Sequence, residues 1–185
     1  KIGWIVGSNG TILKTTNGGS SWNYQITTST ETFNSISILD SERVYIAGTN
    51  GEIIKTIDGG EQWIQSGPQT TNNLLSVCSI DSNSSWTVSY EGLIYNTTDS
   101  GNNWYTISTS DQSNLLDITF INSLEGIAVS LEGRIYNTHN GGVSWYLSPY
   151  YEDTNLKSIS FCDSSNGLTV GPNKSIFKTI DGGNI

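Results

Sequence analysis

A short motif recurs at a fixed spacing along the chain and constrains its fold more than any other feature. The motif is Thr-x-Asp/Asn-x-Gly-x-x-Trp, and it returns every 41 residues without insertion or deletion. A period of about 20 to 50 residues is typical of solenoids, propellers and repeat arrays. The Asp or Asn of the motif stands at Asn17, Asp58, Asp99, Asn140 and Asp181, and its Trp at Trp22, Trp63, Trp104 and Trp145.

The content of one period indicates which of these architectures applies. In residues 34–67, the segments NSISILD, RVYIAGT, EIIKTI and QWIQSG alternate apolar and small or polar residues, as β-strands do. Asn50-Gly51 is a two-residue hairpin signal, because both positions favour positive φ. No helical period of 3.6 residues appears. Four short antiparallel strands in each repeat predict one blade of a β-propeller.

The same alignment predicts the domain organisation. We expect an all-β chain that is a single β-propeller segment over residues 1–185, with four-stranded antiparallel blades. About four and a half blades are present, and we expect them to be part of a longer ring of six to eight. The expected units are a partial blade at 1–26, whole blades at about 34–67, 75–108 and 116–149, and a partial blade at 157–185.

Composition and charge exclude several classes of function. The formal net charge is −9, with only eight Lys and Arg, whereas binding to a phosphate backbone needs clustered cations. We therefore expect no nucleic-acid partner. No apolar run approaches the ~20 residues of a membrane-spanning helix, so we expect no direct membrane insertion. The sequence contains no metal-ligand cluster, nucleophile triad or phosphate-binding glycine loop, and we predict no metal and no cofactor.

The chemistry of the motif favours a structural role. An Asp or Asn side chain accepts hydrogen bonds from backbone N–H groups of its own turn, and glycine permits left-handed backbone angles. The Trp ring covers the hairpin and buries a large area. Asn17 and Asn140 keep the acceptor oxygen but lose the charge. We therefore interpret the motif residues as turn-forming residues rather than as catalytic groups or metal ligands.

The motif is similar to the Asp box (BNR repeat) of sialidases and other β-propellers. The segments GWIVGSNGTILKTTNGGSSW and AGTNGEIIKTIDGGEQW resemble blades of the photosystem II assembly and stability factor family and its non-photosynthetic bacterial relatives. This resemblance implies a seven-bladed, non-enzymatic scaffold that binds protein and lies outside the cytoplasm, in the periplasm, on the cell surface or secreted. The photosynthetic members are expected to carry an arginine-rich patch. This chain has only Arg43 and Arg134, at unrelated repeat positions, which favours a general surface-binding module over a photosystem client.

The loops after each fourth strand depart most from the repeat and are the predicted binding region. In a propeller these loops share one rim with the turns between the second and third strands. Aromatic residues beside carboxylates suit a protein or glycan partner, since aromatic residues are enriched at interfaces. The alternative interpretation is a solvated acidic rim with two half-packed tyrosines. The candidate binding residues are Tyr150, Tyr151, Glu152, Asp153, Tyr90, Glu91 and Glu132.

A glycoside hydrolase is the alternative function, because Asp-box propellers include sialidases and xyloglucanases. Such enzymes usually use two carboxylates about 5–10 Å apart. Asp117 is the weak catalytic candidate, because its repeat equivalents are serines on the strand nearest the central channel. A polar residue in a wet channel is the other interpretation of Asp117. No second carboxylate accompanies it in the repeat pattern, and two arginines cannot form the arginine triad expected of a sialidase. The sequence therefore favours a binding scaffold without catalytic residues.

Overall fold

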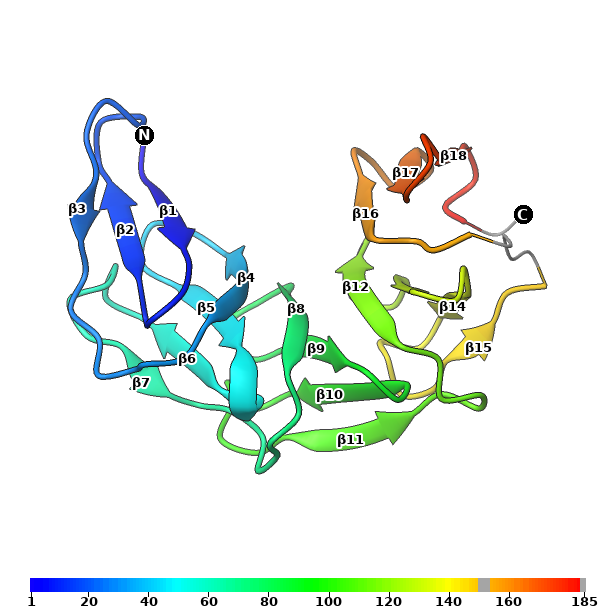
Figure 1. Cartoon of the computed structure of the whole chain (residues 1–185), viewed down its shortest axis with the longest axis horizontal. Helices are drawn as coiled ribbons and strands as arrows, with labels where there is room; N and C mark the ends of the chain where they lie inside the picture. Colours follow the sequence, from blue (N-terminus) through cyan, green and yellow to red (C-terminus); the bar gives the residue numbers. More distant parts are fainter. Residues whose placement is uncertain (150–153, 184–185) are drawn as a thin grey trace. The chain divides into compact units, whose positions relative to one another are not determined.

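The computed structural model describes residues 1–149 and 154–183 of the chain. Within these residues the regular structure consists of β-strands and one short 3-10 turn, arranged as five antiparallel sheets of three or four strands (Figure 1). The fold is therefore all-β and is that of a partial β-propeller, as the repeat predicts. The chain divides into two compact units, Lys1–Ser85 with Thr97–Trp104, and Trp86–Asn96 with Tyr105–Ile185.

Each 41-residue repeat supplies the strands of one sheet. The first and last sheets have three strands and the other three sheets have four. The whole sheets begin one residue ahead of the ranges expected from the sequence. The strands are β1 (Gly3–Val6), β2 (Ile12–Thr15) and β3 (Asn23–Tyr24); β4 (Phe33–Ile38), β5 (Val44–Gly48), β6 (Ile53–Thr56) and β7 (Ile64–Gln65); β8 (Leu74–Ser79), β9 (Ser85–Ser89), β10 (Leu93–Thr97) and β11 (Tyr105–Ser108); β12 (Leu115–Phe120), β13 (Gly126–Ser130), β14 (Ile135–Thr138) and β15 (Tyr146–Leu147); and β16 (Ser158–Phe161), β17 (Gly167–Val170) and β18 (Ile176–Thr179).

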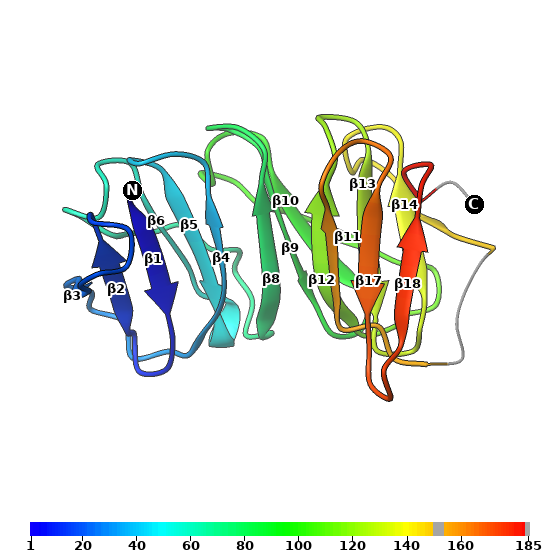
Figure 2. The same cartoon turned by 90° about the horizontal axis from the view of Figure 1, so that it is seen from above.

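The second strand of each whole sheet is buried along its entire length. In β5, β9 and β13 every residue is buried, and the sequences VYIAG, SWTVS and GIAVS contain only apolar, aromatic or small residues. Such strands are typical of sheets that are covered on both faces. Figure 2 shows β5 between β4 and β6 in the second sheet, in agreement with the strand order β4-β5-β6-β7.

The hairpin between the second and third strands forms at the predicted Asn-Gly pair. Asn50 and Gly51 have φ values of 53° and 70°, within the 3-10 turn η1 (Thr49–Gly51). In the next repeat Glu91 takes the Asn position with φ of 62°. A positive φ is uncommon for a residue other than glycine, asparagine or aspartate. Glu91 is therefore held in a strained conformation that its surroundings must support.

Aromatic and aliphatic side chains form the core of each unit. In the first unit Trp4, Phe33 and Ile46 belong to one buried cluster, against which Trp63 packs. In the second unit Phe120 stacks on Trp86, with ring centroids 4.0 Å apart. The same Phe120 meets the edge of Trp145 at 5.9 Å. Phe120 on β12 thus contacts both the box Trp of its own repeat, Trp145, and Trp86 on β9 of the neighbouring sheet.

Hydrogen bonds tie neighbouring sheets together within each unit. The Lys14 ammonium donates to the carbonyl oxygen of Gly59 at 2.6 Å, and so joins β2 to the box turn of the next sheet. The Ser35 hydroxyl oxygen accepts the backbone N–H of Val77 at 3.1 Å, and so joins β4 to β8. Serine suits this position because it is small enough to let two sheets approach and polar enough to bond across the gap.

The fourth strands are shorter than the sequence suggests. The segment QWIQSG predicts a strand of several residues, but β7 contains only Ile64 and Gln65. The backbone N–H of Ser66 makes one more bond, to Ile53 O at 2.8 Å. Gly67 and Pro68 then end the strand, since proline has no N–H to offer a ladder.

Candidate functional site

The box turn is organised around a buried threonine hydroxyl. In the second repeat the Thr56 hydroxyl donates to Asp58 Oδ1 at 2.7 Å and accepts the N–H groups of Asp58 and Gly60 at 3.3 and 2.8 Å. Asp58 Oδ1 also accepts the N–H of Gln62 at 3.0 Å. The threonine-to-box hydrogen bond recurs at Thr15–Asn17, Thr97–Asp99, Thr138–Asn140 and Thr179–Asp181.

The second atom of the box side chain bonds outside this hub. Asn140 Nδ2 donates to the Ser144 hydroxyl at 2.8 Å. Asp99 Oδ2 instead accepts from Asn103 Nδ2 at 2.6 Å. This bond is the largest of several that lower the pKa of Asp99 to about 2, followed by the bond from the Asn103 backbone N–H. The side chains of Asn140 and Asp99 are thus occupied by their own turns and are poorly placed to act as a base or metal ligand.

The box tryptophans are partly rather than fully buried. Trp63, Trp104 and Trp145 have intermediate exposure, and Trp22 is 37% exposed. Trp104 Nε1 donates to the carbonyl oxygen of Ser66. The buried Nε1 atoms of Trp63 and Trp145 have no partner within the described residues. These rings cover the hairpins while keeping one edge at the surface.

Asp117 acts as a tie between two strands of the second unit. Its Oδ2 accepts the Ser158 hydroxyl at 2.8 Å and the Ile159 N–H at 2.9 Å, and its Oδ1 accepts the N–H of Ile118 at 3.0 Å. These bonds join β12 to β16. They match the bond that Ser35 accepts from Val77, since both acceptor–donor pairs are 42 residues apart. Oδ2 of Asp117 is therefore engaged in joining two sheets, and Oδ1 is engaged within β12 itself.

Three of the predicted binding residues lie in the second unit among the described residues. Asn114 connects two of them. Its Oδ1 accepts the backbone N–H of Glu91 at 3.2 Å. Its backbone N–H and its Nδ2 donate to the two carboxylate oxygens of Glu132, at 2.8 and 2.7 Å. Glu91 and Glu132 are exposed, and Tyr90 beside them is 46% exposed. The remaining candidates, Tyr150, Tyr151, Glu152 and Asp153, lie outside the described residues.

Both arginines face carboxylates. Arg43 pairs with Asp40 at 2.5 Å, and its side-chain hydrogen bond is the main cause that lowers the pKa of Asp40 to about 2. Arg134 lies 3.8 Å from Asp111. The Tyr136 hydroxyl also donates to Asp111, and burial together with this bond raises the pKa of Tyr136 to about 12. Neither arginine belongs to a cationic patch of the kind expected in photosynthetic members of the resembled family.

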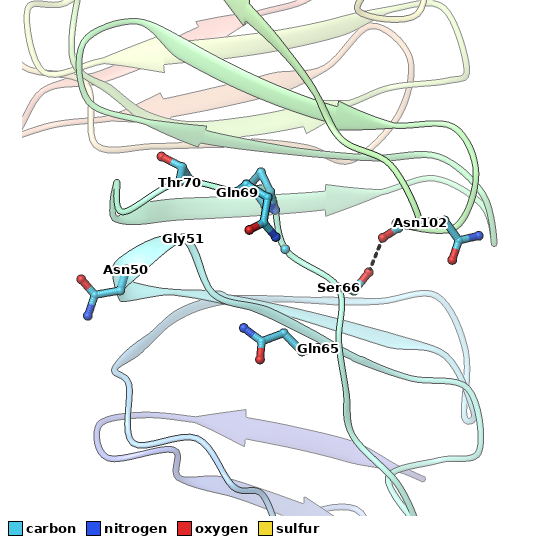
Figure 3. Close-up of a pocket in the computed structure, with 10 residues that line it drawn as sticks. Asn50, Gly51, Gln65, Ser66, Gln69, Thr70 and Asn102 are labelled. Carbon is cyan, nitrogen blue, oxygen red and sulfur yellow. Dashed lines mark hydrogen bonds between the residues drawn. The ribbon is translucent and has the colours of Figure 1, made fainter.

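A pocket of about 450 Å³ in the first unit was missed by the sequence reasoning (Figure 3). It lies between η1, the segment that follows β7 and the box turn of the third repeat. Its walls include Gln65, Gln69 and Asn102. The Ser66 hydroxyl donates to Gly101 O at 2.9 Å and closes one end. The Gly67-Pro68 pair, which the first, third and fourth repeats lack at the aligned positions, was the available sequence signal.

Two properties of residues 1–149 and 154–183 concern metal binding and membrane insertion. None of their His, Cys, Asp and Glu residues form a group of three or more that could hold a metal ion. No helix in this part of the chain is long and apolar enough to cross a membrane.

Comparisons with known proteins give one family. The family model of the photosynthesis system II assembly factor YCF48 matches residues 1–150. No curated protein shows a matching sequence. The solved structure of YCF48 from Cyanidioschyzon merolae superimposes with a TM-score of 0.78 at 18% identity, covering 100% of this chain and 67% of that one.

Two other solved structures share the fold. A structure described as YCF48 bound to D1 peptide matches with a TM-score of 0.52 at 18% identity, covering 97% of this chain and 89% of the other. An ancestral GH74 enzyme matches with a TM-score of 0.72 at 13% identity, covering 96% of this chain and 29% of the enzyme. At these identities the likeness concerns the fold alone.

Proposed function

This chain belongs to the family of the photosystem II assembly factor YCF48, and on that premise we propose that it is a propeller scaffold that binds a protein partner. The observation that carries the proposal is that a solved YCF48 is bound to D1 peptide. Membership of an assembly-factor family also agrees with the prediction that the chain is not an enzyme. Asp117 Oδ2 accepts two inter-sheet bonds and Oδ1 accepts the N–H of the adjacent Ile118, so both oxygens serve a structural role, which argues against a catalytic one.

We place the partner on the loop rim of the second unit, defined by Tyr90, Glu91 and Glu132 together with residues 150–153. The bonds of Asn114 fix the backbone of Glu91 and the side-chain carboxylate of Glu132 before any partner arrives. Preorganised side chains lose less conformational entropy on binding, which favours affinity. The exposed ring of Tyr90 supplies apolar contact area with few rotatable bonds, as hot-spot residues commonly do.

Charge supports a partner with positive potential. The chain carries a net charge of −9, and Arg134 near this rim already faces Asp111. An acidic surface raises the association rate of a basic partner, and added salt reduces that gain. The partner class that we propose therefore differs from one that an arginine-rich patch would select.

As the family resemblance implies, we also propose that the protein acts outside the cytoplasm, which fractionation of cells producing the tagged protein would test.

The experiment is capture of native partners on the immobilised chain, followed by affinity measurement with the captured protein. We expect Tyr90→Ala and the double change Glu91→Gln/Glu132→Gln each to weaken binding about tenfold, the loss expected of an interface residue that contributes more than ~1 kcal/mol. The double change should also flatten the dependence on salt.

Matched controls are Tyr105→Ala, an exposed tyrosine on β11, and Glu61→Gln, an exposed carboxyl in a box turn. Neither should change the affinity. Equal losses in the controls and the rim variants would reject the rim as the binding face. Hydrolysis of a sialoside or a β-glucan by the protein would contradict the scaffold proposal itself.

A further inference from the structure

The pocket beside β7 has the features of a second, peptide-binding subsite. We propose that it binds an extended, uncharged peptide segment by main-chain hydrogen bonds. This inference rests on the proposed protein-binding function and adds the chemistry of one stretch of the partner. It concerns the first unit alone, because every lining residue belongs to that unit.

The lining excludes two ligand classes. None of the ten lining residues has an ionisable or aromatic side chain; the side chains that do line it are amides, hydroxyls and one proline. A charged ligand would give up hydration without gaining a counter-charge, which is unfavourable. An apolar ligand would meet few apolar walls. A volume of about 450 Å³ is within the ordinary range for ligand pockets, so a neutral, hydrogen-bonding ligand remains.

Two of the amides have unused bonding capacity. Neither the Gln65 nor the Gln69 side chain has a hydrogen-bond partner among the described residues, and both are exposed. Figure 3 shows both side chains at the wall of the pocket. A primary amide offers two donors and an acceptor, which matches the C=O and N–H of a peptide group.

The backbone of Gln65 adds a free strand edge. In an antiparallel pair, hydrogen-bonded and non-hydrogen-bonded residue pairs alternate. Ser66 N–H donates to Ile53 O, so the next pair along, Gln65 with Ile54, is the non-bonded kind. Because β7 is the last strand of its sheet, the N–H and C=O of Gln65 point away from β6 along the open edge. Addition of an extended peptide to such an edge is a common recognition mode.

Glycine at position 67 lets the segment after β7 pack against η1 at one wall of the pocket. A Cβ atom at Gly67 would lie 2.4 Å from Gly51 O and 2.8 Å from Ile53 N, so only glycine lets the segment approach η1 so closely. The equivalent residues in the other repeats are Ile26, Ser108 and Pro149. The close approach therefore depends on a residue that the aligned positions of the other repeats lack, and a peptide is favoured over a saccharide because the free edge presents backbone groups.

The test is a titration of the whole 185-residue chain with acetyl-Thr-Val-Thr-Val-amide, followed by two-dimensional NMR of backbone and side-chain amides. This probe is uncharged and favours extended structure. We expect shifts of the Gln65 backbone signal and of the Gln65 and Gln69 side-chain signals, with a Kd of about 1 mM. Gln65→Leu/Gln69→Leu should weaken binding about tenfold, as expected for the loss of two hydrogen bonds.

Comparison of Gln65→Pro with the single change Gln65→Leu separates the contribution of the Gln65 backbone N–H from that of its side-chain amide. Its lost N–H points outward, so an edge strand tolerates proline there and the fold should survive. Gln65→Pro should weaken binding of the probe at least as much as Gln65→Leu does. Gln62→Leu, an exposed glutamine outside the pocket, should leave the Kd unchanged.

No shift of the pocket signals at about 10 mM probe would overturn the inference, given the expected affinity. The same signals responding to cellotetraose but not to the peptide would overturn it in favour of a glycan. Neither result bears on the proposed function, which fails if no protein partner binds the chain or if the protein hydrolyses a glycan.

Discussion

The box turn of the second repeat and that of the fourth form the same loop around different chemical groups. In the second, the box residue is the carboxylate of Asp58, and in the fourth it is the amide of Asn140. In both, Oδ1 accepts the threonine hydroxyl and an N–H four residues later, at 2.7 and 3.0 Å in the second and at 3.0 and 3.0 Å in the fourth. The turn therefore requires one acceptor oxygen and no charge.

What differs between the boxes is the group that meets the second atom of the side chain. Where that atom is a donor, in Asn17 and Asn140, the residue four positions later is a serine whose oxygen accepts. Where it is an acceptor, in Asp99, the residue four positions later is Asn103, whose amide donates. The two positions are chemically matched, so box residues should be exchanged together with their partners.

The largest effect should come from removing the buried threonine hydroxyl that organises both the aspartate boxes and the asparagine boxes. Thr56→Val should lower the free energy of unfolding by about 3 kcal/mol, because the buried N–H of Gly60 loses its partner along with two other bonds. Thr138→Val should cost about the same. Chemical denaturation of the two variants checks this, and a much smaller loss in the asparagine box would break the equivalence of the two turns.

Removing the tryptophan that follows each box should have the next largest effect. A fully buried Trp changed to Ala costs about 3–5 kcal/mol, and the part-exposed Trp63 should cost about 2 kcal/mol. Trp145→Ala should match it, since Trp145 is also half-buried and packs on Phe120. Thermal unfolding of both variants is the measurement, with the exposed Ile57→Ala as a control that should leave Tm unchanged.

A smaller effect should distinguish the box of Asp99 from the box of Asp58. Asp99→Asn would set an amide donor against the Asn103 amide, whereas Asp58 makes no such side-chain bond, so Asp99→Asn should lower Tm more than Asp58→Asn. The folded pKa of Asp99 is lowered from 3.8 to about 2, so its stabilisation is complete above about pH 4 and is lost as the pH falls toward 2. The Tm difference between wild type and Asp99→Asn should shrink over that interval. A difference that does not depend on pH would contradict this assignment.

The smallest effect should come from Asn140→Asp. The Ser144 hydroxyl, which now donates to the Tyr146 hydroxyl at 3.0 Å, can rotate and donate to the new carboxylate oxygen while the Tyr146 hydroxyl donates to it in turn. The bond that Asn140 now donates would then be replaced rather than lost. We expect a Tm within about a degree of wild type, below the shift produced by ~1 kcal/mol in a domain of this size. Adding Ser144→Ala should make the aspartate less favourable than the asparagine. An unchanged Tm in that double variant would show that the partner residue is irrelevant.

Strand positions were predictable from sequence because the repeat supplies five aligned copies of each one. The hairpin at Asn50-Gly51 follows from the backbone angles that these residues favour, and the structure has it. The early end of β7 was not predicted, because alternation in QWIQSG does not reveal that Gly67 and Pro68 turn the chain toward η1. The sheets at the two ends have three strands each, and the blade bounds expected from the repeat stay predictions.

Site residues were harder to predict, because their roles depend on contacts between repeats. Asp117 stood out as the exception among serines, yet it performs the serine's task of accepting an N–H from the next sheet. Asn114 was not singled out, although it holds Glu91 and Glu132. Its importance arises from a bond to a turn 23 residues earlier, which no local pattern encodes. The binding roles of Tyr90, Glu91, Glu132 and residues 150–153 stay predictions.

The hydrogen bond from a lysine of one repeat to the box turn of the next repeat affects how such a chain can be lengthened in evolution. Lys14 and Lys55 each reach a carbonyl oxygen 45 residues ahead, which is just beyond one repeat. A duplicated segment of 41 codons carries one donor and one acceptor position, so its donor bonds to the acceptor of the repeat that follows and its acceptor receives the donor of the repeat that precedes. Lengthening by gene duplication then needs no new interface, whereas a single-residue insertion inside a repeat would move donor and acceptor out of step.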